Sequence, residues 1–160
     1  MSNYPQTVLA PIWMSRVLFA AGCYNLLWGS WVVLFPTLSF AYSGMQREGV
    51  TLPYPQLWQC IGMIVGVYGI GYLVASRDPL THWPIVLVGF LGKVFGPIGA
   101  VDGALKGELP WSTLWTNGFN DLIWWVPFAI ILIRAYARRQ SAKNLSAGSS
   151  SDGSIRVTSA

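Results

Sequence analysis

Charged residues are scarce in this chain. Only 10% of its 160 residues are Asp, Glu, Lys or Arg, whereas an ordinary soluble domain carries roughly a quarter. Hydrophobic residues make up 53% of the chain, and its mean hydropathy is +0.46. A water-soluble fold of this length would have too little polar surface to cover so much apolar material. The composition therefore argues against a soluble domain.

Cysteine and histidine are almost absent as well. Cys23 and Cys60 are the two cysteines and form no C-x-x-C pair, and His82 is the single histidine. So few candidate ligands argue against a disulfide framework and against most zinc and haem sites. We therefore expect no metal site, packing roles for both cysteines and an exposed turn position for His82.

Familiar catalytic and nucleic-acid motifs are also missing. The sequence contains no G-x-S-x-G, P-loop or dinucleotide fingerprint. The net charge of +4 would suit nucleic acid, but the basic residues are scattered and no aromatic-basic module accompanies them. We expect no nucleic-acid binding and recognise no catalytic residues, so the sequence favours a protein that is not an enzyme.

Four long apolar blocks dominate what is present. Each approaches the ~20 residues that a helix needs to cross the hydrocarbon layer, and short stretches with Pro, Gly and charge separate them. The blocks are Arg16–Pro36, Leu57–Ser76, Pro84–Leu105 and Thr116–Tyr136. They predict an all-α polytopic integral membrane protein folded as a four-helix transmembrane bundle, with lipid as its main surroundings.

The regions flanking the blocks complete the predicted organisation. Residues 1–15 form a short N-terminal segment, residues 16–136 the transmembrane domain, and residues 137–160 a Ser-, Gly- and Ala-rich tail that we expect to be disordered. Four spans place both termini on one side. Seven basic residues share that side against two on the other: Arg16, Arg77, Arg134, Arg138, Arg139, Lys143 and Arg156 against Arg47 and Lys106. The positive-inside rule then predicts cytoplasmic termini.

Glycines recur at helical spacing in two of the blocks. The third block contains a stripe of Gly89, Gly92, Gly96, Gly99 and Gly103, and the second contains Gly62, Gly66 and Gly69, with Gly71 nearby. Small residues let membrane helices approach backbone to backbone. We expect the second and third spans to pack closely, or one stripe to form a dimer contact. Asn25 and Gln59 are expected to hydrogen-bond between helices.

One charged residue lies deep inside the third block. Holding Lys93 there costs at least ~2.5–3.5 kcal/mol on insertion scales, so it needs a partner or an aqueous cavity. Pro97 stands one turn later and, having no N–H, leaves the carbonyl of Lys93 without its helical partner. Pro97, and Pro127 in the fourth block, are therefore predicted helix breaks.

Asp121 is the expected partner of Lys93. It faces the same way as Asn117 and Trp125 on the fourth span, and Asn120 and Asp102 are further candidate members of the polar group. Two interpretations stay open. The pair either fixes the register of two helices, or it forms a site for a proton, an ion or a small ligand.

With these residues in view, the chain resembles the DoxX-like group of small bacterial four-span membrane proteins. The similar elements are "AGCYNLLWGSWVVLFP", "GMIVGVYGIGYLVAS", "RDPLTHWP" and "LGKVFGPIG". The resemblance implies a four-helix bundle in the bacterial inner membrane and an association with redox or quinone-linked systems. The residues themselves predict no cofactor, and the resemblance makes quinone the one to consider.

A second similarity concerns "YPQLWQCIGMIVGVYG", which looks like small proteins labelled as alkyl hydroperoxide reductases. The peroxidases behind that label use a P-x-x-x-T-x-x-C motif at a helix start, which lowers the pKa of the thiol. The chain reads "TLPYPQLWQC" before its second apolar block and lacks the threonine. We do not carry peroxidase chemistry over to Cys60.

Three functions follow from these observations, in order of preference. The first is an accessory or assembly component that associates with itself or with a larger membrane complex. The second is a small proton-linked carrier with a midplane site at Lys93 and Asp121. The third is a quinone- or lipid-linked redox component, which rests on the resemblance alone.

Overall fold

The computed structural model describes residues 10–46, 52 and 54–155, with side chains described up to Asn144. These residues form helices and no strand. The elements are α1 (Ile12–Leu34), α2 (Pro36–Tyr42), α3 (Pro55–Ala75), α4 (Trp83–Leu105), α5 (Thr113–Asn117), the π-helical turn η1 (Gly118–Leu122) and α6 (Ile123–Ile155).

Four helical segments are long and apolar enough to cross a membrane, which confirms the predicted fold class. They are Ile12–Leu34, Pro55–Ala75, Trp83–Leu105 and Thr113–Asn144. The 23 residues of α1 extend about 35 Å at 1.5 Å per residue, enough for a hydrocarbon layer of about 30 Å. Each span also presents large apolar side chains outward, such as Leu27 with 74% and Val126 with 68% of its surface exposed. A bilayer solvates such a surface, whereas water does not.

The span boundaries differ from the prediction by a few residues. The first span begins at Ile12 rather than Arg16, so part of the predicted N-terminal segment belongs to α1. It ends at Leu34, and Pro36 opens the unpredicted short helix α2, because proline at the first helical position gives up no hydrogen bond. The fourth span begins at Thr113, with α5 and η1 preceding α6. Residues 1–9 lie outside the described residues.

The predicted disordered tail is largely helical. Helix α6 continues without interruption from the membrane span to Ile155. The residues that leave the span, "RAYARRQSAK", are mostly strong helix formers. They extend a helix that is already nucleated. Extension is easier than nucleation, because each added residue gains one backbone hydrogen bond. Residues 156–160 lie outside the described residues.

Neither interior proline breaks its helix, contrary to prediction. Helix α4 runs through Pro97 and α6 runs through Pro127. Proline is tolerated inside a membrane helix where a neighbouring group takes over the backbone partner that it removes. For Pro97 that group is a tryptophan of α6, described with the site below.

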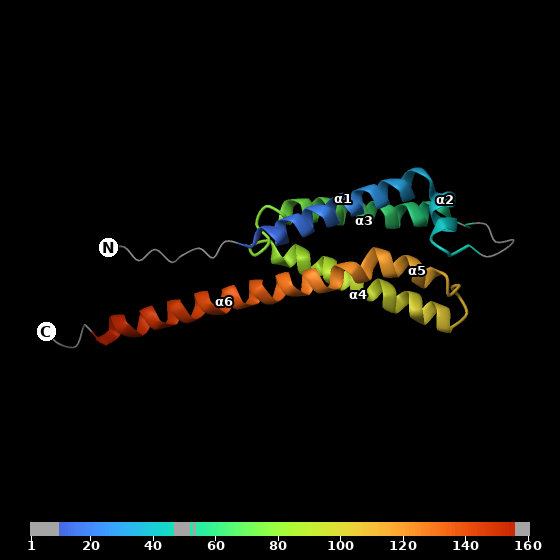
Figure 1. Ribbon diagram of the computed structural model, residues 1–160. Helices are drawn as coiled ribbons and strands as arrows, with labels where there is room; N and C mark the ends of the chain where they lie inside the picture. The colour runs from blue at the N-terminus through green and yellow to red at the C-terminus, as the bar shows by residue number, and fades with distance from the viewer. Residues whose placement is uncertain (1–9, 47–51, 53, 156–160) are drawn as a thin grey trace.

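The bundle consists of two helical hairpins (Figure 1). Helix α1 packs along α3, and α4 packs along the continuous segment α5–η1–α6, while contacts between the two pairs are fewer. The start of α1, the α3–α4 link and the outgoing part of α6 lie at one end, which we call the terminal end. Helices α2 and α5 lie at the other, which we call the loop end. This arrangement sets α4 and α6 side by side and antiparallel.

Glycines bring α1 and α3 into close contact. A Cβ on Gly62 would lie 2.9 Å from the carbonyl oxygen of Gly29, and one on Gly22 would lie 2.9 Å from that of Gly69. Backbone therefore faces backbone across this pair. Gly62 and Gly69 of the second span thus pack on the first span, whereas only Gly71 lies against the third, where a Cβ would be 3.1 Å from Ile85. The signal missed was the Gly22/Gly29 repeat in α1.

The glycine stripe of α4 meets several neighbours instead of one. A Cβ on Gly89 would collide with the phenol of Tyr72 from α3, one on Gly103 would lie 2.9 Å from Leu109, and one on Gly96 would lie 3.4 Å from Asp121 Oδ2. At Gly92 and Gly99 a Cβ would meet nothing within 4 Å. The stripe therefore has a packed side and an open side.

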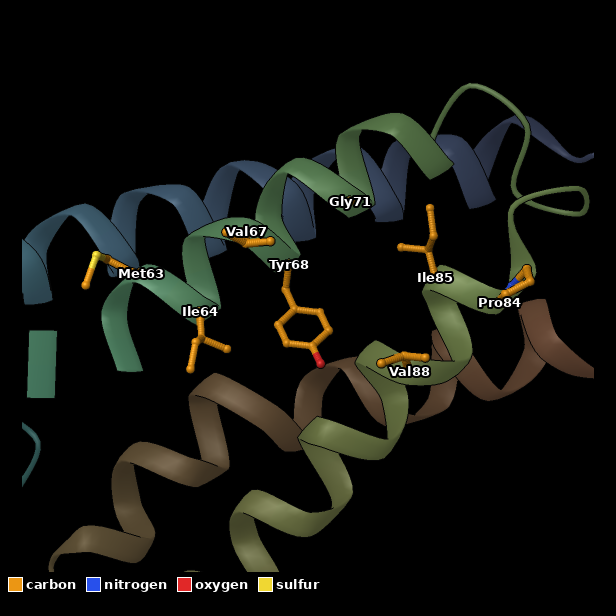
Figure 2. Close-up of a pocket in the computed structure, with 8 residues that line it drawn as sticks. All are labelled: Met63, Ile64, Val67, Tyr68, Gly71, Pro84, Ile85 and Val88. Atoms are coloured by element: carbon orange, nitrogen blue, oxygen red, sulfur yellow. The ribbon is translucent and has the colours of Figure 1, made fainter. Parts of the chain in front are cut away.

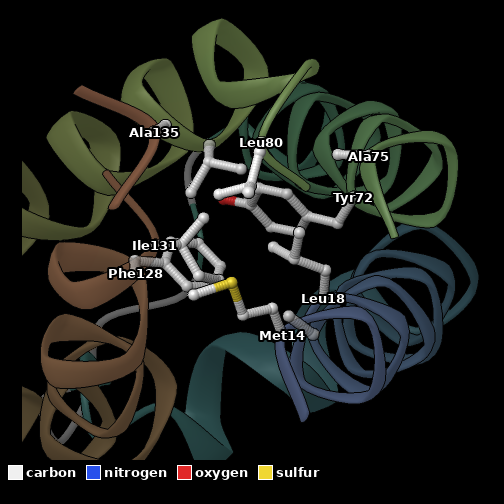
Figure 3. Packing of buried hydrophobic residues seen from close by; sticks show 10 residues of the cluster. Met14, Leu18, Tyr72, Ala75, Leu80, Phe128, Ile131 and Ala135 are labelled. Atoms are coloured by element: carbon white, nitrogen blue, oxygen red, sulfur yellow. The ribbon is translucent and has the colours of Figure 1, made fainter. Parts of the chain in front are cut away.

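An apolar core joins the two hairpins at the terminal end (Figure 3). Tyr72 packs edge-on against Phe128, with ring centroids 5.2 Å apart. Met14 and Leu18 of α1 and Ile131 of α6 complete the centre of this cluster, all without measurable exposure. The core holds all four spans together on one side of the polar site.

Hydrogen bonds join the hairpins at the loop end. Ser112 Oγ donates to the carbonyl oxygen of Gly44 at 2.7 Å, and Thr116 Oγ1 donates to that of Ser43 at 3.1 Å. Gly44 has φ +72°, a conformation that side chains with a Cβ rarely adopt. The polar site thus lies between an apolar core and a hydrogen-bonded loop contact.

Candidate intramembrane site

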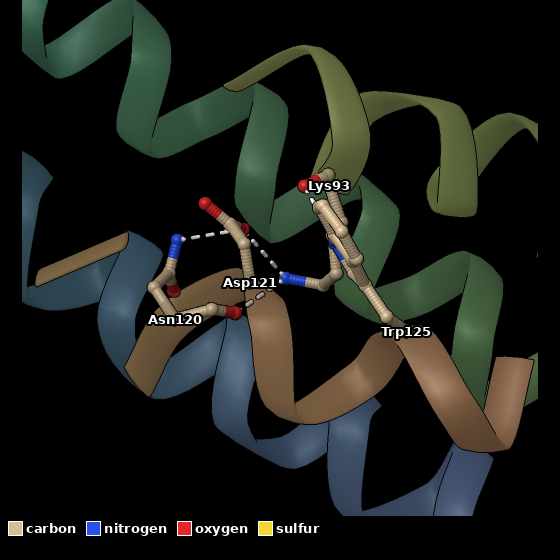
Figure 4. A network of polar contacts seen from close by, with 4 residues as sticks. All are labelled: Lys93, Asn120, Asp121 and Trp125. Atoms are coloured by element: carbon tan, nitrogen blue, oxygen red, sulfur yellow. Dashed lines mark hydrogen bonds and ion pairs between the residues drawn. The ribbon is translucent and has the colours of Figure 1, made fainter. Parts of the chain in front are cut away.

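Lys93 and Asp121 meet inside the bundle (Figure 4). Lys93 Nζ lies 3.3 Å from Asp121 Oδ1, and the two residues are only 6% and 7% exposed. Lys93 Nζ also donates to the backbone carbonyl oxygen of Asn120 at 2.8 Å. The ammonium group therefore has an anion and a carbonyl as partners, which offset the cost of placing it in a low-dielectric layer.

Asn120 supports the carboxylate. Its amide Nδ2 donates to Asp121 Oδ1 at 3.1 Å, so this oxygen accepts from both Lys93 and Asn120. Asn120 and Asp121 are consecutive residues of η1, the single π-helical turn of the fourth span. A π-turn widens the helix locally, and such turns occur frequently at functional sites. In this chain, the turn presents a backbone carbonyl and the next side chain to the same lysine.

Trp125 replaces the hydrogen-bond donor that Pro97 lacks. Pro97 removes the N–H that would bond the carbonyl of Lys93, and the indole Nε1 of Trp125 donates to that oxygen at 3.0 Å. Lys93 is therefore held at both ends, through its ammonium by η1 and through its carbonyl by α6 (Figure 4). The sequence pointed to the unpaired carbonyl and to the face of Trp125, but not to this bond.

Two of the expected supporting residues lie outside the network. Asp102 forms an exposed ion pair with Lys106, which follows it by one helical turn at the end of α4. Asn117 lies in α5 and makes no hydrogen bond to Lys93 or Asp121. Gln59 makes its expected contact between helices, because its Nε2 donates to the carbonyl of Val33 at 2.8 Å.

Three buried polar atoms of the bundle have no partner among the described residues. They are Asn25 Oδ1, Asn120 Oδ1 and Trp124 Nε1. Tyr24, beside Asn25 in α1, packs against Trp124 with ring centroids 6.0 Å apart, which brings the two helices together at this level. Asn25 is 2% exposed and its Oδ1 has no partner among the described residues, so the hydrogen bond between helices expected of it is not found there.

A separate apolar groove lies between α3 and α4 (Figure 2). Its volume is about 680 Å³, and its lining is almost entirely aliphatic. Tyr68, whose ring projects between the two hairpins, is the exception. The lining residues are Met63, Ile64, Val67, Tyr68, Gly71, Pro84, Ile85 and Val88. We call this feature the α3–α4 groove.

The α3–α4 link at the terminal end is a compact polar turn. His82 Nδ1 lies 3.0 Å from the carbonyl oxygen of Asp78, and the backbone N–H of Thr81 donates to Asp78 Oδ1 at 3.3 Å. Hydrogen bonding by the Thr81 side chain lowers the pKa of the Asp78 carboxyl, and Arg138 and His82 act in the same direction. His82 is half-buried and its contact is local.

Comparison of the chain with protein-family models, with curated proteins and with solved structures finds no match.

Proposed function

We propose that this protein is an accessory or assembly component of a larger membrane complex, which it joins by receiving a transmembrane helix of a partner along α4. The observation that carries the proposal is the α3–α4 groove together with the open side of the glycine stripe. The resemblance to DoxX-like proteins supports a redox- or quinone-linked complex in the bacterial inner membrane.

The groove and the open glycines form one continuous face. At about 100° per residue, Ile85, Val88, Gly92 and Gly99 fall within about 60° of one another around α4. Ile85 and Val88 line the groove, and a Cβ added at Gly92 or Gly99 would have no neighbour within 4 Å. The distance from Ile85 to Gly99 is about 21 Å along the helix. A partner helix therefore finds an apolar face about four turns long, with small residues at Gly92 and Gly99 that permit close approach.

Helix association in lipid depends on such close approach. Lipid tails are as apolar as the helices, so burial of apolar surface supplies little drive, and van der Waals contact along small residues supplies more. The polar contacts of Lys93, by contrast, are made within the chain. They stiffen the α4–α6 hairpin and so present a rigid α4 face, which fits an assembly role.

Site-specific photocrosslinking in native membranes tests the proposal. A benzophenone amino acid replaces Val88 in the groove or, as the control, Val126, which is 68% exposed on α6. We expect a discrete protein adduct from position 88 and none from position 126. A second substitution, Gly92→Leu, should abolish the adduct, because its Cβ meets no atom of this chain within 4 Å and the leucine side chain occupies the space of the partner helix.

A matched glycine controls for nonspecific effects. Gly66 also has no neighbour within 4 Å of an added methyl, but it belongs to a different cavity, beside α1. Gly66→Leu should leave the position-88 adduct intact. An adduct of twice the mass of the chain identifies a second copy as the occupant. Adducts to lipid alone, or equal loss with Gly66→Leu and Gly92→Leu, contradict the proposal.

A specific observation favours a second candidate function, the small proton-linked carrier. Asn120, which bonds both members of the Lys93–Asp121 pair, and Trp124, one turn later on the same span, each have a buried polar atom without a partner among the described residues. Buried polar groups normally find a partner, often water. A hydrated path to Asp121 would let a proton reach the midplane. In sealed proteoliposomes, a pH gradient should then collapse faster with the wild-type chain than with Asp121→Asn, and equal rates would exclude this function.

The orientation is part of the proposal. Six basic side chains are described at the terminal end and one at the loop end: Arg16, Arg77, Arg134, Arg138, Arg139 and Lys143 against Lys106. The positive-inside rule favours the terminal end as cytoplasmic. Arg47 and Arg156, which entered the same count, lie outside the described residues.

A further inference from the structure

A small pocket at the terminal end combines an arginine, two aromatic rings and two leucines. It lies between α4 and α6, has a volume of about 130 Å³, and is lined by Trp83, Leu87, Leu132, Tyr136 and Arg139. The guanidinium carbon of Arg139 lies 4.9 Å from the centroid of the Trp83 ring. We propose that this pocket binds the phosphate headgroup of an anionic phospholipid.

The charge of Arg139 is available to a ligand. Among the described residues the ion pairs are Lys93–Asp121 and Lys106–Asp102, so Arg139 has no carboxylate partner. Stacking on Trp83 holds the planar guanidinium in place while its N–H edges stay free to donate. Asp78, the acidic side chain described at this end, interacts with Thr81, Arg138 and His82 instead.

Neighbouring groups also favour an anion. Gln140 Nε2 donates to the hydroxyl oxygen of Tyr136 at 2.6 Å, which leaves the Tyr136 O–H as a donor. Helix α4 begins at Trp83, and no acidic residue occupies its first turn. The positive end of its dipole therefore reaches the pocket without being neutralised. The pocket is far smaller than those of about 300–1,000 Å³ that enclose drug-sized ligands, which suits a single phosphate group.

The apolar half of the pocket selects a lipid over a free phosphate. Leu87 and Leu132 are half-buried members of membrane spans and lie one turn deeper than Trp83 and Tyr136. A lipid with its phosphate beside Arg139 could therefore lay its acyl chains against these leucines, along α4 and α6. Tryptophan, tyrosine and arginine at a membrane boundary are typical of headgroup contacts.

Lipid retention by the purified full-length chain tests the site. The chain is released from nanodiscs of dioleoylphosphatidylcholine with a minor share of dioleoylphosphatidylglycerol, and bound lipid is counted by native mass spectrometry. We expect phosphatidylglycerol to be retained above its share in the disc. Arg139→Gln should weaken its retention at least about fivefold, the factor that corresponds to ~1 kcal/mol per interfacial basic residue. Soluble glycerol phosphate should not compete.

Matched variants separate the pocket from general surface charge. Arg134→Gln removes an equal charge from the same helix. Arg134 lies five residues before Arg139 and therefore points roughly 140° away from it around the helix axis. Arg134→Gln should change retention less than Arg139→Gln does. Arg139→Lys keeps the charge without the planar stacking and should fall between Arg139→Gln and the wild type. Equal losses for Arg134→Gln and Arg139→Gln, competition by glycerol phosphate, or unchanged retention in Arg139→Gln would each overturn the proposal.

Discussion

At the scale of single residues, the chain places one lysine where a charge is costly and surrounds it with partners. Asp121 neutralises Lys93, Asn120 contributes both a carbonyl to the lysine and an amide to the carboxylate, and Trp125 bonds the carbonyl that Pro97 leaves free. Each contact compensates a loss that another residue causes. The pair therefore couples α4 to η1 and α6 more firmly than apolar packing alone would.

Removing one member of the pair should harm the fold more than removing both. Lys93→Met and Asp121→Asn should each lower the free energy of unfolding by about 3 kcal/mol, because each leaves one buried group without its charged partner. The double variant should recover most of that loss. Equilibrium unfolding in mixed micelles measures the cycle.

The exposed pair of α4 provides the control. Asp102→Asn removes the partner of Lys106 at the surface and should change stability by less than about 0.5 kcal/mol. If the losses of the two single variants simply add in the double variant, Lys93 and Asp121 are not coupled and the register role is wrong.

At the scale of elements, glycine position decides which helices touch. The stripe on α4 is regular in sequence, yet Gly89 lies against Tyr72 while Gly92, less than one turn later, has no neighbour within 4 Å of an added methyl. Regular spacing indicates a face that permits close approach. It does not indicate which neighbour, if any, uses it.

Alanine substitutions should separate the two kinds of glycine. Gly89→Ala should destabilise the protein by about 1–3 kcal/mol, because the methyl collides with the buried Tyr72 phenol between α3 and α4. Gly92→Ala should be neutral or stabilise it by up to about 1 kcal/mol, since alanine is the better helix former. Thermal unfolding in one detergent compares them. A loss for Gly92→Ala as large as for Gly89→Ala would contradict this packing.

At the scale of the whole molecule, two hairpins are joined at both ends. The core at the terminal end includes the contact between Tyr72 and Phe128. At the loop end, the hydroxyl groups of Ser112 and Thr116 donate hydrogen bonds to backbone carbonyl groups just after α2. The start of α1 and the outgoing α6 share the terminal end with the α3–α4 link (Figure 1). A four-span chain in a membrane must expose these three segments to one compartment.

Labelling of single cysteines should reveal this topology. In a chain with Cys23 and Cys60 replaced by Ala, Thr81→Cys and Ser141→Cys should react with an impermeant maleimide only in inside-out vesicles. Glu108→Cys should react only in intact cells, because it follows α4 at the loop end. Reaction of Thr81→Cys and Ser141→Cys from opposite sides contradicts the four-span fold. The reverse pattern for all positions contradicts only the proposed orientation.

The four spans and the need of Lys93 for a counter-charge could be predicted from the amino-acid sequence alone. Hydrocarbon accepts only long apolar helices with internally bonded backbones, so four apolar blocks predict four spans. In the same solvent a buried lysine needs a partner, and Asp121 was the expected one because it lies on the next span, within reach of the long lysine side chain. These conclusions depend on local composition and on the helical repeat, which a single chain displays directly.

The pairing of the helices and the partners of several polar groups could not be predicted and follow from the folded bundle. Gly62 and Gly69 of α3 pack on α1, Trp125 bonds the carbonyl of Lys93, and Asn25 Oδ1 has no partner among the described residues. Helix spacing defines faces, but pairing depends on crossing geometry and on the fit of all side chains at once. That fit is a property of the assembled bundle, and no single segment carries it.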